Sequence, residues 1–263
     1  MTWRFFAAPL VAAFLAACTA TGGGSGEGAQ PAVMAQPASS DQQQRAKTHT
    51  ELGSLYFLEG STAIAMEEAR LALASDPNYA PAFNLLGMTH MILNEPRLAE
   101  ENFQKAMRLA PGDPEIRNNY GWFLCQNGRE RDSLAHFLSA ARNPLYTAPT
   151  KAYTNAGICA QKTKDDKAAE DYLLTALRLA PANTLALFSL AELSYRQGRY
   201  PAARQWLTDI ERIVEPTAEV LWLALRVERK LGNREAENRY ANQLRRRFPG
   251  SPEQRLLGQG QFE

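Results

Sequence analysis

The chain has 263 residues, of which 45% are apolar and 22% charged, and its formal net charge is +1. This composition is typical of a globular protein of one large or two small domains. The near-neutral charge argues against a nucleic acid as the partner. The only dense basic cluster, Arg245-Arg246-Arg247, is expected to end a helix, where cations suit the helix dipole.

The amino end has the features of a targeting segment. Arg4 supplies a short positive start, and residues 5–17 carry no charge. This apolar stretch is shorter than the roughly 20 residues that span a bilayer, so residues 1–17 predict a secretory signal peptide. Leu15-Ala16-Ala17-Cys18 closes it and resembles a bacterial lipobox, which implies that Cys18 is lipidated. The alternative is an ordinary signal peptide in which this cysteine is incidental.

A segment without core-forming residues follows the cysteine. Glycine, serine, proline, glutamine and alanine dominate residues 19–45. Such a segment cannot bury a core, so residues 18–45 are predicted to be the lipidated cysteine and a flexible linker. The residue after the cysteine is Thr19 and not aspartate. By resemblance to Gram-negative lipoproteins, this implies an acyl anchor in the outer membrane, with the folded part facing the periplasm.

The remainder of the chain is repetitive. Gly53, Gly87, Gly121 and Gly157 recur at intervals of about 34 residues, which is the period of the tetratricopeptide repeat (TPR), a helix A, a turn and a helix B. With glycine at position 8, the repeats run over 46–79, 80–113, 114–149, 150–183, 184–217 and 218–249, and 250–263 is a tail. No strand pattern appears, so we predict an all-α fold, a right-handed TPR superhelix of about six repeats.

Particular positions of the repeat have physical roles. Small residues at positions 8, 20 and 27 let helices A and B approach, and large apolar residues at 4, 7 and 24 fill the remaining space. Position 15 is glycine or asparagine in five repeats, and both residues tolerate the left-handed conformation that ends a helix. Position 15 is occupied in turn by Gly60, Asn94, Gly128, Lys164, Gly198 and Gly232.

The third and fourth repeats carry a more specific series. It reads NNYGWFLC over Asn118–Cys125, NPLY over Asn143–Tyr146, where two residues are inserted, and NAGIC over Asn155–Cys159. The series resembles the type IV pilus biogenesis and stability lipoproteins (pilotins), the PilF/PilW family. The resemblance covers the whole chain. It implies an outer-membrane lipoprotein that promotes localisation and multimerisation of the pilus secretin, on which pili and twitching motility depend.

Two other functional classes remain open from the sequence. One is a TPR scaffold lipoprotein of another envelope complex, such as outer-membrane protein assembly or peptidoglycan synthesis. The other, weaker, is an enzyme regulator. The chain has no phosphate-binding loop, nucleophile elbow or metal motif, so we expect neither an enzyme nor a cofactor. His49, His90 and His136 occupy unrelated repeat positions and are expected to pack in or near the core.

Two cysteines lie in neighbouring A helices. Cys125 and Cys159 stand at positions 12 and 10 of repeats three and four. An exported protein meets an oxidising compartment, and a bridge needs Cα atoms within roughly 7 Å. We predict a Cys125–Cys159 disulfide, with two buried free thiols as the alternative. No histidine or third cysteine lies at ligand spacing, so no metal site is expected.

A protein-binding groove is predicted on the concave face. In TPR arrays, positions 2, 5, 9, 12 and 13 of helix A line this face. Methionine adapts to irregular partners, and asparagine can hydrogen-bond an extended peptide. The alternative is that some of these side chains only pack between adjacent A helices. The candidate residues are Phe57, Asn84, Met88, Met91, Ile92, Asn118, Trp122, Gln126 and Ile158.

Overall fold

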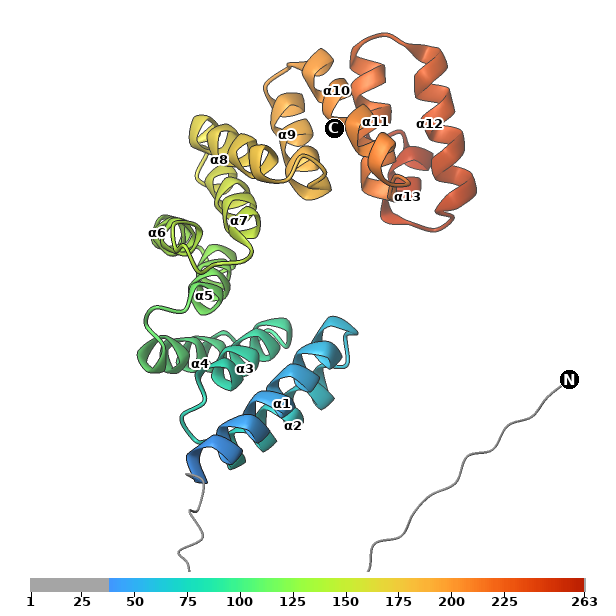
Figure 1. The fold of residues 1–263 in the computed structure, drawn as a ribbon. Coiled ribbons are helices and arrows are strands. Elements are labelled where there is room, and N and C mark those ends of the chain that lie inside the picture. The colour runs from blue at the N-terminus through green and yellow to red at the C-terminus, as the bar shows by residue number, and fades with distance from the viewer. Residues whose placement is uncertain (1–37, 263) are drawn as a thin grey trace, which may run out of the picture. The chain divides into compact units, whose positions relative to one another are not determined.

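The computed structural model describes residues 38–262, which form thirteen α-helices and no strand. The predicted signal peptide 1–17, the predicted lipidation site Cys18 and most of the predicted linker lie outside the described residues. Six helix pairs follow one another in chain order, and a short helix ends the array (Figure 1). The A and B helices of the pairs are α1 (Ala38–Leu58) and α2 (Thr62–Ser75), α3 (Ala80–Ile92) and α4 (Pro96–Leu109), α5 (Pro114–Gln126) and α6 (Glu130–Ala141), α7 (Pro149–Lys162) and α8 (Asp166–Leu179), α9 (Thr184–Arg196) and α10 (Tyr200–Ile213), and α11 (Ala218–Lys230) and α12 (Arg234–Arg247); the last helix is α13 (Pro252–Gln259).

The turns within the pairs have the predicted backbone conformation. All six residues at position 15 have a positive φ, including the non-glycine residues Asn94 at 58° and Lys164 at 60°. A left-handed residue redirects the chain after the last turn of helix A, so helix B can begin within a few residues. The expected helix-turn-helix register is confirmed by these turns.

Close approach within a pair depends on the glycine at position 8. A Cβ atom placed on Gly87 would lie 2.8 Å from the ring of Phe103, and one on Gly157 would overlap the side chain of Leu173. Phe103 and Leu173 are both fully buried. Each large side chain of helix B therefore packs directly on the backbone of helix A, as the residue pattern predicts.

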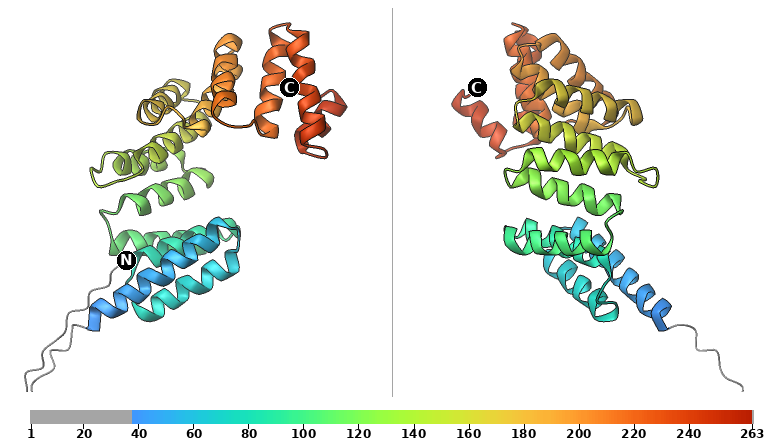
Figure 2. Two further views of the ribbon diagram at one scale, coloured as in Figure 1. Left: turned by 45° about the vertical axis from the view of Figure 1, so that its right-hand side comes forward. Right: turned by 90° about the vertical axis from the view of Figure 1, so that its left-hand side faces the viewer.

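The helices form two layers. Each A helix contacts the A helix of the next pair, whereas no B helix contacts another B helix in the described chain. The core is correspondingly divided into several clusters that follow one another along the stack, as expected for a repeat array. Because only the A helices approach one another, the A-helix layer is the inner side of the array (Figure 2).

Both ends differ from the predicted boundaries. Helix α1 begins at Ala38, inside the segment predicted as linker to residue 45. Ala, Gln and Arg there are good helix formers, and Asp41 in the first turn suits the helix dipole. The predicted tail contains α13, whose Leu256 and Leu257 pack against the last cluster. The array is thus longer at both ends than its repeat pattern indicates.

Candidate protein-binding groove

A groove of about 740 Å³ opens on the inner side of the first three pairs. Helices α1 and α3 supply most of its walls, and Glu115, Asn119 and Lys151 of α5 and α7 close one end. Among the predicted residues, Phe57, Asn84 and Met88 line it. Further residues from α1, the α2–α3 turn and α3 complete it, namely Lys47, Thr50, Glu51, Ser54, Leu55, Leu58, Tyr79, Pro81 and Leu85.

Large apolar side chains are exposed around this groove. Leu55 is 59% exposed, Leu58 is 80% exposed, and Ile92, at the end of α3, is 60% exposed. Isolated exposed leucines are ordinary, but a contiguous apolar surface marks a site of protein contact. Leu55 and Leu58 were absent from the predicted set. Leu58 is at position 13 of the first repeat, one of the positions that line the concave face, so the repeat register could have identified it.

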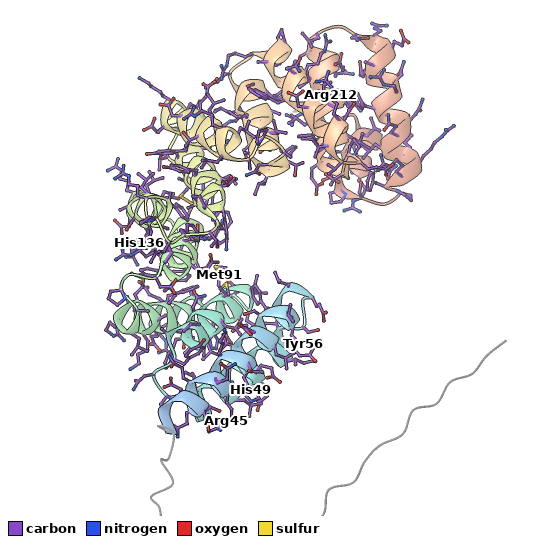
Figure 3. The ribbon with its side chains drawn as sticks, viewed as in Figure 1. Arg45, His49, Tyr56, Met91, His136 and Arg212 are labelled. Carbon is purple, nitrogen blue, oxygen red and sulfur yellow. A yellow bond between two sulfur atoms is a disulfide. The ribbon has the colours of Figure 1, made fainter. Side chains whose placement is uncertain are left out.

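Of the two predicted methionines of α3, Met88 lines the groove, and Met91 lies three residues further along the same helix. Met88 packs against two buried clusters. Met91 packs against one of these two, the cluster that contains Phe103 and Phe123. Both remain partly exposed on the inner side, where Figure 3 shows Met91. Unbranched, polarisable side chains in this position can rearrange around a partner without opening the core.

A chain of amide side chains crosses the inner layer beneath the groove. Asn119 donates to Asn84 Oδ1 at 3.3 Å, Asn118 donates to Asn119 Oδ1 at 3.3 Å, and Asn155 donates to Asn118 Oδ1 at 3.1 Å. These bonds join α3, α5 and α7. Asn118 is 0% exposed, so its predicted role as a peptide contact is wrong. Its side-chain amide instead forms hydrogen bonds with other asparagines, one of which links α5 to α7.

The two-residue insertion fixes the far end of the groove. Tyr146 is buried, and its hydroxyl donates to Glu115 Oε2 at 3.1 Å. Burial, followed by the nearby Glu115 carboxylate, raises the pKa of Tyr146, so the phenol remains protonated and a donor. Lys151 forms a salt bridge with the same carboxylate, and Asn143 donates to the carbonyl of Gly112 at 3.0 Å. The insertion thereby braces the start of α5.

Trp122, Gln126 and Ile158 continue the inner face beyond this end. Trp122 packs half-buried on the cluster that contains Cys125, Phe137 and Cys159. Gln126 is exposed, and Ile158 lines a separate groove over α7, α9 and α11. The predicted residues therefore share one face but not one groove.

Cys125 and Cys159 are joined by a disulfide, with their Cα atoms 5.9 Å apart. Both residues are buried, and the bridge ties α5 to α7. The histidines are dispersed. His49 and His90 bond to Glu68 and Glu95, and no group of three potential metal ligands occurs within residues 38–262. Helices long and apolar enough to span a bilayer are likewise absent from that range.

Known proteins resemble the chain in both sequence and fold. Tetratricopeptide-repeat models match residues 80–113 and 166–215. The type IV pilus assembly protein PilF of Pseudomonas aeruginosa is 29% identical over 205 residues, which cover 78% of this chain and 81% of PilF. The crystal structure of PilW, described as a widely conserved type IV pilus biogenesis factor, aligns with a TM-score of 0.75 and 31% identity, over 81% of this chain and 97% of PilW. The structure of Pseudomonas aeruginosa PilF gives a TM-score of 0.72, with 27% identity.

Proposed function

The chain belongs to the PilF/PilW family of type IV pilus assembly proteins, and we propose that it acts there as a pilotin for the pilus secretin. Its relatives are non-enzymatic assembly proteins, and this chain is a binding protein and not an enzyme. In the proposed role it binds a segment of the secretin, accompanies it to the outer membrane and promotes its assembly into a ring.

The observation that carries the proposal is the apolar groove over α1 and α3. Leu55 and Leu58, which line it, are largely exposed, and a partner segment in the groove would bury them. Met88 offers an adaptable wall, while Lys47 and Glu51 provide a polar edge that can bond a peptide backbone. An extended or helical segment of the secretin fits this combination of an apolar centre and a polar rim.

The lipid anchor is the second part of the proposal. Cys18 would hold the protein in the outer membrane through its acyl chains, after cleavage of residues 1–17. A secretin subunit bound in the groove would then travel with the anchor. The lipoprotein sorting route would thereby bring the secretin to the membrane in which it assembles.

The test is deletion of the gene, followed by membrane fractionation and detection of heat-stable secretin multimers. We expect the multimers, surface pili and twitching motility to be lost, and to return with the unmodified chain. A Cys18→Ala chain should fold but fail to restore multimers in the outer membrane. Normal multimers after deletion would contradict the pilotin role and favour a scaffold in another envelope complex.

A further inference from the structure

The last residue of helix A changes chemistry along the array. It occupies position 13 of every repeat, and it is exposed in all six. It is apolar in the first two repeats, an amide in the third and a cation in the last three. In chain order these residues are Leu58, Ile92, Gln126, Lys162, Arg196 and Lys230. The inner face therefore has an apolar half and a cationic half.

The cationic half is hollowed. A groove of about 480 Å³ over α7, α9 and α11 is lined by Lys162, Arg196 and Arg226, with Glu192 as its only carboxylate and Tyr195 as its aromatic wall. We call it the cationic groove. A neighbouring recess shares Tyr195 and Arg226 with it and extends the basic surface along α11. The groove over α1 and α3, by contrast, pairs two lysines with two glutamates and has no net charge.

Two of these cations donate hydrogen bonds only to neutral groups, although Arg226 also interacts electrostatically with Glu192. Lys162 Nζ donates to Gln126 Oε1 at 2.9 Å and to the carbonyl of Cys125 at 3.4 Å. Arg226 Nε donates to the carbonyl of Phe262 at 2.9 Å, and its guanidinium lies 4.5 Å from the ring centroid of Tyr195. Neither forms a salt bridge in the described part of the chain. Both can therefore accept a carboxylate from outside without losing an existing ion pair.

The helix dipole does not account for the whole arrangement. It favours cations in the last turn, which covers Lys162 and Arg196. Arg226 lies a turn before the end of α11, and α1 and α3 end without a lysine or arginine. The dipole also gives no reason for a hollow between the cations, or for Tyr195 beneath a guanidinium.

Phe262, which lines the neighbouring recess, shows what this part of the surface accepts. The carbonyl of Phe262 receives the hydrogen bond from Arg226, and its ring stacks on Trp222 with centroids 5.7 Å apart. The guanidinium of Arg229 lies 4.0 Å from the centre of the same ring. A peptide segment with an aromatic side chain thus fits against α11 in this recess, held by an arginine donor and a cation–π contact.

We propose that the cationic groove is a second binding site, which takes an acidic, aromatic-containing segment of a partner protein. Carboxylates of that segment bind Lys162 and Arg226, and an apolar side chain packs on Ile158 and Tyr195. A recess between helices suits a narrow peptide better than a flat bilayer surface. No residue lines both this groove and the apolar groove, so the proposal does not depend on the secretin proposal, and two segments can bind at once.

The test is fluorescence anisotropy with the full chain and a labelled synthetic peptide in which glutamate alternates with phenylalanine and glycine. We expect binding that weakens with salt, and no binding of the same peptide with glutamine in place of glutamate. The double variant Lys162→Gln/Arg226→Gln should weaken binding about tenfold or more. The control Lys167→Gln/Arg234→Gln removes the same charge from exposed sites on α8 and α12 and should leave binding unchanged.

Three results would overturn the proposal. One is the absence of binding to the acidic peptide, and another is equal weakening by the double variant and its control. The third comes from vesicles containing phosphatidylglycerol: if they bind through Lys162 and Arg226 while the peptide does not, the surface contacts lipid. All four substituted side chains are exposed or partly exposed, so the variants should fold. Circular dichroism melts check this, so that a loss of peptide binding can be assigned to the groove and not to unfolding.

Discussion

Cys125 and Cys159 form a disulfide that joins α5 to α7, the two A helices that carry the series by which the sequence resembles its family. A hydrogen bond between the side chains of Asn155 and Asn118 connects the same two helices. A covalent and a polar link therefore hold the middle of the inner layer. The apolar groove and the cationic groove lie on either side of these linked helices, and each uses residues of α7 in its wall.

Reduction of the disulfide should destabilise the array. The bridge closes a loop with a sequence separation of 34, for which loop-closure entropy gives about 3–4 kcal/mol. We expect a lower melting temperature with reductant, and the same decrease in a Cys125→Ser/Cys159→Ser variant without it. Thermal denaturation followed by circular dichroism measures both. A melting temperature that reductant does not change would show that the bridge adds no stability.

A glycine-to-alanine substitution should have opposite effects on stability at a closely packed position 8 and at an open helical site. Gly87→Ala places a methyl group 2.8 Å from the buried Phe103 ring and should cost about 1–3 kcal/mol. Gly258→Ala in α13 meets no atom within 4 Å and should gain up to about 1 kcal/mol from helix propensity. Urea denaturation compares them. If both variants gained stability, the glycine would not be needed for close packing.

We expect the buried His136 to make the folded protein less stable as the pH is lowered. Burial, followed by the nearby Arg117, lowers its pKa from the usual 6.5, and its Nδ1 is buried without a hydrogen-bond partner. The unfolded chain therefore binds this proton at a higher pH than the folded chain does. The contribution of neutral His136 to the free energy of unfolding is fully present above pH 6.5. It is lost as the pH falls from 6.5 through the lower pKa of the folded state.

The measurement for His136 is the free energy of unfolding between pH 8 and pH 5, for the wild type and a His136→Phe variant. Phenylalanine retains the edge-on contact with Tyr120, whose ring centroid lies 5.0 Å away. The variant should lose less stability than the wild type below about pH 6.5. Parallel curves for the two proteins would assign the acid sensitivity to other groups.

The sequence predicted the repeat architecture well because each position has a local physical reason. Gly87 needs the space taken by Phe103, and Lys164 follows the same turn geometry as glycine. The ends were less predictable. Ala38 begins a helix within a composition typical of linkers, and α13 has no repeat register.

The binding face was predicted only in part. Register placed Met88 and Phe57 on the groove, but it could not show that Asn118 is consumed by neighbouring amides. Such a bond depends on the spacing of two separate A helices, which a single repeat does not encode. Similarly, Arg226 was missed, because its significance arises from Tyr195 on the preceding A helix.

Binding of the secretin by the inner face of α3 can be measured by a pull-down of the secretin with a Met88→Glu/Met91→Glu variant. Buried or partly buried charges there would oppose an apolar partner. Met107→Glu on α4 is the matched control, because this methionine is also partly buried but lies on a B helix. With all three proteins folded by circular dichroism, we expect the double variant alone to fail to retain the secretin. Retention by the double variant equal to that of the wild type would contradict this expectation.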